Sequence, residues 1–227
     1  MTPMMRVNGI NVHYQVHGQG EWLVLIAGLG TDLSIFKPYV DVLSKDFRVL
    51  VFDNRGAGQS DKPDVPYSVQ MMAQDTVSLM DALDIEHAHI LGVSLGGRIA
   101  MQLALDHQQR VKKLILVSTS PSLQARLSVV MKAMKRIRSL SRSQQPYYAF
   151  KRQLAASSGY DCTDRLHQIT APTLVIYGKN DRLANQTQAE EMKKRIASCG
   201  LVGFDGGHWF FMLHANQVID EVRKFLA

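Results

Sequence analysis

The chain has 227 residues, 46% hydrophobic and 20% charged, a composition typical of one folded globular domain and not of a disordered or repetitive chain. Its net charge of +6 raises nucleic acids, anionic membranes and acidic ligands as candidate partners. The longest apolar run covers nine residues, 22–30, far fewer than the roughly 20 that a membrane-spanning helix needs.

A tight hairpin is predicted at the start of the chain, followed by buried strands. Asn8-Gly9 lies between two short alternating segments in residues 5–17, a pattern typical of two antiparallel strands. Compact apolar segments bounded by turn residues follow at residues 23–27, 48–52, 88–92, 114–118, 173–177 and 201–204. Continuous apolar runs of this length favour strands buried on both faces, as in a parallel sheet covered by helices.

Helical patterns lie between these strands. Capping residues and apolar spacing predict helices from Ser68 to about Leu83, over residues 95–107, from a capping box of Thr187 and Glu190 to about Ala197, and over residues 216–226. Strands and helices therefore alternate along the chain. This order predicts an α/β fold with a doubly wound, mostly parallel sheet and an N-terminal antiparallel hairpin.

An insertion is predicted at residues 121–160, between the fourth and fifth buried strands. One apolar stripe at helical spacing is formed by Leu123, Leu127, Val130, Met134 and Ile137. Pro146 must break or begin an element, and a second short helix is expected over residues 149–156. We therefore expect a core of residues 1–120 and 161–227 with a small helical lid at 121–160.

A candidate nucleophile lies in the motif G-x-S-x-G, which residues 92–96 match where a predicted strand ends and a predicted helix begins. Such a turn strains the serine backbone, and small residues two positions on either side let the Ser94 hydroxyl project above the sheet. The amino end of the next helix favours developing negative charge. This context favours a nucleophile over a Gly-rich connection with a capping serine.

A serine nucleophile needs a base that is itself oriented by an acid. Asp181 and His208 follow the last two predicted strands, so they and Ser94 all lie beyond carboxyl ends of strands, where open α/β sheets bind ligands. His214 is the alternative base, but it is expected to start the last helix. Asp205 is the alternative acid, but it shares one short loop with His208.

Acyl transfer also needs N–H donors for the oxyanion. The residue after the serine, Leu95, is predicted to supply one. The loop AGLG at residues 27–30 is predicted to supply the other through the Leu29 N–H. Taken alone, this loop equally fits a plain strand exit that contains glycine, and the serine motif decides between the two interpretations.

With these residues the chain resembles the α/β-hydrolase fold superfamily over essentially its full length. Within the superfamily it is most similar to the small esterase, enol-lactonase and acyl-carrier methyl-ester esterase group. The motifs are AGLG at 27–30, FDNRGAGQSD at 52–61, GVSLGG at 92–97, GKNDR at 178–182 and GGHW at 206–209. The resemblance implies Ser94 as nucleophile, His208 as base and then acid, and Asp181 as orienting carboxylate. It also implies the Leu29 and Leu95 amides as the oxyanion hole.

Some positions depart from the resemblance or point to other branches. Ala27 and Ala57 stand where many relatives have histidine, and Val93 replaces the histidine or tyrosine often found before the nucleophile. These departures leave the backbone donors intact and weaken only a detailed substrate assignment. The segment 52–61 is expected to hold loops together rather than to bind substrate. Arg98 matches the GGR of the menaquinone-pathway synthase branch, which acts on an acidic substrate.

The predicted function is hydrolysis of carboxylic esters of small to medium acyl groups through an acyl-enzyme, on a small-molecule substrate. No metal or organic cofactor is expected. Two alternatives stay open. The same triad serves lyases and C–C hydrolases of acidic substrates, and related folds act as ligand receptors or signalling partners without catalysis.

The positive charge is local to the predicted lid. Residues 121–160 contain no Asp or Glu and eight basic side chains, Arg126, Lys132, Lys135, Arg136, Arg138, Arg142, Lys151 and Arg152. Without these eight, the 26 Lys and Arg fall to 18 against 20 acidic residues. With no recognised nucleic-acid fold, nucleic-acid binding is excluded. The lid is either a solvated face or a surface that attracts acidic acyl groups, an acidic carrier protein or an anionic lipid surface.

The expected compartment is the cytoplasm. The first residues, MTPMMRVNG, lack the apolar stretch of a secretory signal. Cys162 and Cys199 are the two cysteines, too few for a disulfide framework or a four-ligand zinc site.

Overall fold

The computed structural model describes residues 3–123 and 145–227. The predicted N-terminal hairpin is confirmed, with β1 (Met4–Val7) antiparallel to β2 (Ile10–His17). Its turn places Asn8 and Gly9 at φ 45° and 80°. Asparagine and glycine tolerate this left-handed conformation, so the dipeptide determines the turn.

The sheet of the described chain has eight strands in the order β1-β2-β4-β3-β5-β6-β7-β8. The six predicted apolar segments form its parallel part, β3 (Trp22–Ile26), β4 (Arg48–Phe52), β5 (Ala88–Val93), β6 (Val111–Val117), β7 (Thr173–Gly178) and β8 (Cys199–Phe204). The hairpin joins through β2, which runs antiparallel to β4. The chain leaves β3 towards β4 and then crosses back to β5, so the order of strands reverses between β3 and β5. Ligands of such sheets bind at this reversal, beyond the carboxyl ends of the strands.

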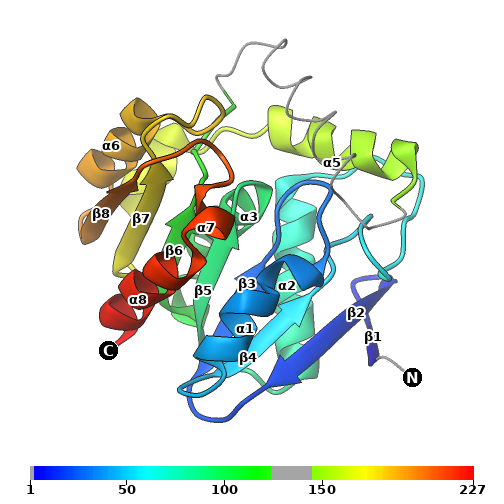
Figure 1. Cartoon of the computed structure of the whole chain (residues 1–227). Helices are drawn as coiled ribbons and strands as arrows, with labels where there is room; N and C mark the ends of the chain where they lie inside the picture. Colours follow the sequence, from blue (N-terminus) through cyan, green and yellow to red (C-terminus); the bar gives the residue numbers. More distant parts are fainter. Residues whose placement is uncertain (1–2, 124–144) are drawn as a thin grey trace.

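Helices cover both faces of the sheet (Figure 1). One face packs on α2 (Val69–Ala82), α3 (Leu95–Asp106), α6 (Gln186–Arg195) and the 3₁₀ helix η3 (Thr163–Gln168). The other packs on η1 (Leu33–Phe36), α1 (Lys37–Leu43), α7 (Phe210–Leu213) and α8 (Ala215–Leu226). A further 3₁₀ turn, η2 (Gln108–Arg110), leads into β6. The predicted doubly wound α/β architecture is confirmed.

The start of α2 agrees with its prediction, because the Ser68 hydroxyl accepts a hydrogen bond from Met71 N at 3.0 Å. The predicted cap of α6 is wrong. Asn185 and Gln188 form the capping box two residues earlier, with bonds of 3.0 and 3.3 Å, and the helix ends at Arg195. Asparagine is a stronger N-cap than threonine, and this start lets the buried Gln188 side chain also donate to the carbonyl of Ser122 at 2.9 Å.

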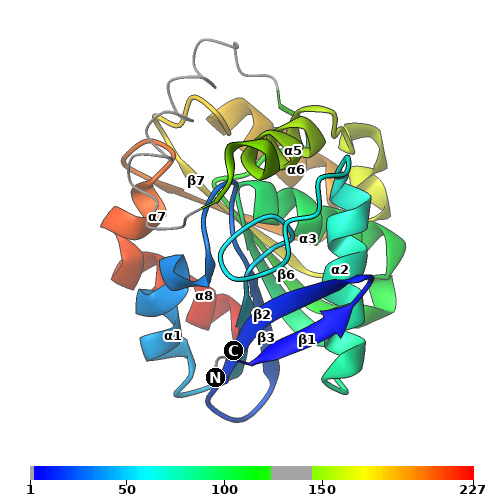
Figure 2. The same ribbon diagram turned by 90° about the vertical axis from the view of Figure 1, so that its right-hand side faces the viewer.

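The second helix of the predicted lid is confirmed as α5 (Tyr147–Ser158), with Pro146 at its N-cap. It crosses the molecule at the carboxyl end of the strands (Figures 1 and 2). The predicted amphipathic helix falls outside the described residues, apart from Leu123. The division into core and lid stays a prediction. In the described part of the chain, no helix combines the length and hydropathy needed to cross a membrane.

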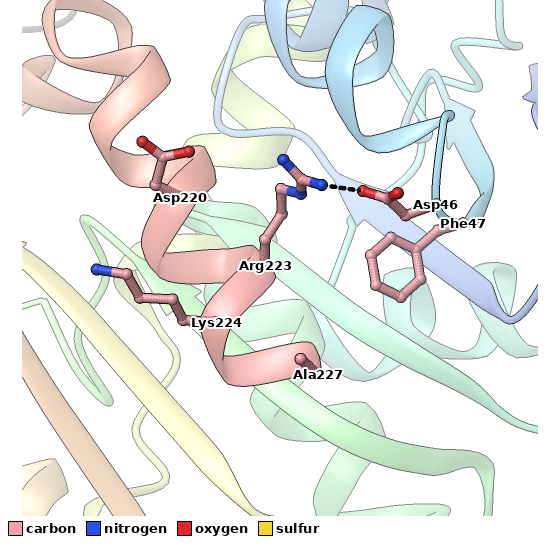
Figure 3. Close-up of a pocket in the computed structure, with 6 residues that line it drawn as sticks. All are labelled: Asp46, Phe47, Asp220, Arg223, Lys224 and Ala227. Atoms are coloured by element: carbon pink, nitrogen blue, oxygen red, sulfur yellow. Dashed lines mark ion pairs between the residues drawn. The ribbon is translucent and has the colours of Figure 1, made fainter.

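A cavity of about 510 Å³ opens at the opposite end of the sheet, where α8 meets the loop that leads into β4 (Figure 3). It is lined by Asp46, Phe47, Asp220, Arg223, Lys224 and Ala227. Arg223 pairs with Asp46 at 2.9 Å, and Lys224 pairs with Glu221 at 2.7 Å. Its basic side chains are thus engaged with neighbouring carboxylates, and it lies away from the strand ends that carry the candidate site.

Candidate active site

Ser94 occupies a strained turn between β5 and α3. Its backbone has φ 55° and ψ −115°, a region that residues other than glycine seldom adopt. A Cβ on Gly92 would lie 2.3 Å from the carbonyl oxygen of Gly96, and a Cβ on Gly96 would lie 2.0 Å from that of Ile26. The two glycines of the motif are therefore required by backbone contacts.

Neighbouring polar groups hold this turn in place. Ser94 N donates to the carbonyl of Val117, at the end of β6, at 2.9 Å. The hydroxyl of Thr119 donates to the carbonyl of Ser94 at 2.7 Å. A strained residue persists only where its surroundings fix it in this way.

The structure brings the three predicted triad residues together. The Nε2 atom of His208 lies 3.0 Å from Ser94 Oγ, and its Nδ1 atom lies 2.8 Å from Asp181 Oδ2. With the Nδ1 proton donated to Asp181, Nε2 of the neutral ring is left to accept the Ser94 proton. This is the arrangement of an activated serine nucleophile.

Asp181 is itself fixed in position by hydrogen bonds. Its side chain is fully buried, and its second oxygen, Oδ1, accepts from Leu183 N at 2.8 Å and from Ala184 N at 3.1 Å. The backbone of His208 is also fixed, because the hydroxyl of Ser118 donates to its carbonyl at 3.0 Å. The side-chain oxygen and nitrogen atoms of Ser94, His208 and Asp181 therefore all have a hydrogen-bond partner.

The predicted oxyanion donors lie at the same place. A Cβ added to Gly28 would lie 3.3 Å from the carbonyl oxygen of Val93 and 3.4 Å from Ser94 Cβ, so the loop after β3 packs directly on the turn. Leu95 is the first residue of α3, where N–H groups have no partner within the helix. The small cavity here is lined by Gly28, Leu29, Thr31, Ile35, Val93, Ser94, His208, Trp209 and Phe211. Within residues 3–123 and 145–227, the N–H groups of Leu29 and Leu95 have no protein acceptor.

The alternative base and acid have other roles. His214 stands at the N-cap of α8 and stacks on Phe204, with ring centroids 6.1 Å apart. Asp205 is exposed and pairs with Lys179 at 2.9 Å, and this ammonium lowers the pKa of the Asp205 carboxyl. His208 and Asp181 are therefore the pair that the fold presents to Ser94.

The segment 52–61 joins loops, as predicted. The buried carboxylate of Asp53 lies 2.7 Å from His13 Nδ1 and accepts from Leu33 N at 2.8 Å and from Gln59 N at 2.7 Å. Asn54 donates to the carbonyl of Ala27 at 2.8 Å, at the start of the loop of residues 27–30, which is called the oxyanion loop below after its predicted role. The hydrogen bonds of segment 52–61 thus hold the loops around the site, and none of its residues lines the small cavity beside Ser94.

Arg98 is engaged by the chain itself. Its guanidinium is buried and donates to the carbonyls of Ser120 at 3.1 Å and Ser157 at 2.8 Å, and to both serine hydroxyls. Burial lowers the pKa of Arg98 to about 10. The side chain therefore connects α3, the loop after β6 and the end of α5. Throughout the residues that the structure describes, no group of three or more His, Cys, Asp or Glu is placed to hold a metal ion.

Several supporting residues were not predicted from the sequence. Thr119 and Ser118 follow β6 in the segment LVSTS, whose hydroxyls could have been recognised as hydrogen-bond donors at a strand end. Gln153 of α5 is fully buried and bonds the oxyanion loop. No local pattern distinguishes this glutamine from its neighbours in the sequence.

A family model described as the alpha/beta hydrolase fold matches residues 21–133. The chain belongs to the α/β-hydrolase fold superfamily. This confirms the superfamily that the motifs indicated.

Relatives and solved structures agree with this membership. The chain is 29% identical to a poly(3-hydroxyalkanoate) depolymerase of Ectopseudomonas oleovorans, over 90% of this chain and 83% of that protein. It is also 29% identical to a protein of Variovorax paradoxus (strain S110) that is named as a carbamate hydrolase, RutD, over 95% of this chain and 96% of that protein. The structure of an enol-lactonase from Burkholderia xenovorans LB400 superposes with a TM-score of 0.87 at 29% identity, over 99% of both chains. A hydrolase from Pseudomonas aeruginosa PA01 gives a TM-score of 0.91 at 27% identity, over 100% of this chain and 98% of that one.

Proposed function

We propose that this hydrolase cleaves carboxylic esters of small to medium acyl groups through an acyl-enzyme on Ser94. The observation that carries the proposal is the hydrogen-bonded chain from Ser94 through His208 to the buried Asp181. Ser94 lines one small cavity together with Gly28 and Leu29 of the loop after β3. It also directly precedes α3, whose first N–H groups have no partner within the helix. Nucleophile, base and oxyanion donors are the groups that acyl transfer requires.

The mechanism assigns one role to each group. Ser94 Oγ attacks the ester carbonyl carbon while His208 Nε2 accepts its proton, and the Leu29 and Leu95 N–H groups bind the oxyanion. The tetrahedral intermediate collapses, and the alcohol leaves with the proton from His208. Water then gives a proton to His208 and attacks the acyl carbon, and His208 returns that proton to Ser94 Oγ as the acyl–oxygen bond breaks, which releases the carboxylic acid and restores both residues. Asp181 holds the tautomer and stabilises the imidazolium.

The names of the relatives support attack on a carbonyl carbon, but they do not agree on the group that leaves. A poly(3-hydroxyalkanoate) and an enol-lactone both contain ester bonds, whereas a carbamate carbonyl is also bonded to nitrogen. The alternative chemistry on an acidic substrate would benefit from a cation at Arg98. The serine oxygens already hold that guanidinium, so we favour the ester.

Attraction of acidic substrates or partners by the basic lid stays a hypothesis. Six of its eight basic residues fall outside the described residues. Of the other two, Arg152 pairs with Asp64 at 3.1 Å and Lys151 lies 5.0 Å from the ring centre of Tyr147. These local contacts support a solvated face for Lys151 and Arg152.

The test combines active-site labelling with a substrate series. A fluorophosphonate should modify Ser94, located by peptide mapping, and Ser94→Ala should lower kcat by about 10⁴-fold or more. Ser78→Ala on α2 is the matched control and should leave both labelling and turnover unchanged. The series should include p-nitrophenyl esters of increasing chain length, a lactone, a thioester and a carbamate. Unlabelled Ser94 in folded protein, or full ester turnover by Ser94→Ala, would overturn the proposal.

A further inference from the structure

The buried face of α5 carries a glutamine whose polar atoms are all engaged. Gln153 is 0% exposed, and a buried amide costs free energy unless its donors and acceptors are bonded. Its Oε1 atom accepts from Gly30 N at 3.2 Å and from Gln145 Nε2 at 3.0 Å. Its Nε2 atom donates to the carbonyl of Arg55 at 2.8 Å. The side chain thus links α5 to the loops that follow β3 and β4.

The bond to Gly30 fixes one of the two peptide planes that flank Leu29. The other plane, between Gly28 and Leu29, is held because the Gly28 carbonyl accepts from Thr31 Oγ1 at 2.9 Å. Since N–H and C=O point in opposite directions across a trans peptide, fixing that carbonyl also aims the Leu29 N–H. The plane after Leu29 leads into Gly30 at φ 72°, a conformation that glycine can leave easily. In the described chain, the acceptor that holds the peptide plane between Leu29 and Gly30 is Gln153 Oε1.

An apolar contact seats the same helix on the same loop. Phe150 lies three residues before Gln153, so both side chains share one face of α5. Phe150 is buried and packs against Leu29 and against Trp209, the neighbour of His208. One face of α5 therefore contacts both the backbone and the side chain of the loop that carries the predicted oxyanion donor.

We infer that Gln153 is a positioning residue for the oxyanion hole. Its carboxamide holds the peptide between Leu29 and Gly30 and thereby keeps the Leu29 N–H aimed at the carbonyl oxygen of the substrate. The inference rests on the proposed function, and it makes α5 part of the catalytic geometry as well as a cover over the site. Removal of an oxyanion donor costs about 10²- to 10³-fold in kcat. A donor that is present but misaimed should cost less, about 10- to 100-fold.

The test uses Gln153→Met, which keeps the length of the side chain but has no acceptor for the Gly30 N–H. Its kcat for a p-nitrophenyl ester should fall about 10- to 100-fold with KM changed less than about threefold, because the oxyanion forms only in the transition state. The Ki of a trifluoromethyl ketone, whose adduct with Ser94 carries an oxyanion, should rise in parallel with KM/kcat. Gln153→Glu retains an oxygen acceptor and should recover part of both losses.

The matched control is Tyr148→Phe on the same helix. It removes a side-chain hydrogen bond of 2.7 Å to the carbonyl of Lys62, which lies outside the oxyanion loop. We expect unchanged kcat and Ki for this variant. A thermal unfolding curve of each variant separates loss of stability from loss of turnover.

Three results would overturn the inference. Folded Gln153→Met with wild-type kcat and wild-type Ki would show that the Leu29 N–H needs no support from α5. An equal fall in kcat for Tyr148→Phe would show a general effect of loosening the helix. Failure of both Gln153 variants to fold would assign the residue to stability alone. If instead Ser94→Ala kept full ester turnover, the proposed function itself would fail.

Discussion

Replacement of Asp181 by asparagine should inactivate the enzyme although it preserves the shape of the side chain. Oδ1 of Asp181 accepts from the N–H groups of Leu183 and Ala184, so an asparagine must place its oxygen there. Its NH₂ group then occupies the position of Oδ2 and faces Nδ1 of His208 at about the present 2.8 Å. Two donors cannot share that contact. The imidazole must therefore shift its proton to Nε2, which then cannot accept the proton of Ser94.

The loss should approach that of a reversed tautomer, about 10⁴-fold in kcat. This corresponds to about 5.4 kcal/mol at 1.36 kcal/mol for each tenfold. KM should change little, because the Asp181 side chain is fully buried and does not line the cavity beside Ser94. The assay is steady-state hydrolysis of a p-nitrophenyl ester, with ¹⁵N NMR of the His208 ring to identify the protonated nitrogen.

Asp205→Asn is the control for this prediction. That residue is an exposed aspartate in the loop before His208, and its ion pair with Lys179 contributes little. Its kcat should stay within about twofold of the wild type, because an exposed ion pair has little effect on the site. If Asp181→Asn retained more than a tenth of wild-type kcat, or kept its proton on Nδ1, the reasoning would be refuted.

Three further predictions concern stability. Gly96→Ala should lower the free energy of unfolding by about 1–3 kcal/mol and reduce ester turnover, because its new Cβ meets backbone at 2.0 Å. The control Gly159→Ala meets its nearest atom at 3.4 Å, so equal urea midpoints for the two variants would contradict this. Asn185→Ala should cost about 1 kcal/mol in urea unfolding without a change in kcat, whereas Thr187→Ala should cost less, and the reverse order would restore the cap expected from the sequence. Glu21 has its pKa lowered to about 2 by hydrogen bonds from a lysine and a histidine, so it contributes stability above pH 4.5 that is lost as the pH falls towards 2. Glu21→Gln should flatten this part of the stability curve slightly, since the carboxylate is exposed, and an unchanged acid slope would count against it.

The sequence by itself determined the sheet and the place of the site. The apolar runs indicated all six parallel strands, since strands buried on both faces need to be apolar throughout. The expected burial holds for most of β3 to β7 but is wrong for β8, which lies at the edge of the sheet and is largely half-buried. The motif around Ser94 indicated the strained turn, because Gly92 is required by a backbone contact four residues away, whereas the contact that requires Gly96 is made with Ile26 of β3. Asp181 and His208 could be predicted to meet Ser94 because carboxyl ends of parallel strands share one edge.

Only the tertiary structure decided the contacts between segments that are far apart in the sequence. The α6 cap went to Asn185 because this start also buries Gln188 against the segment after β6. The buried pair of His13 and Asp53 joins residues 40 positions apart, beyond any local pattern. Gln153 acts across 123 positions. Its sequence neighbourhood shows a polar helix, and only the seat of α5 on the oxyanion loop turns that amide into a buried acceptor for the Gly30 N–H.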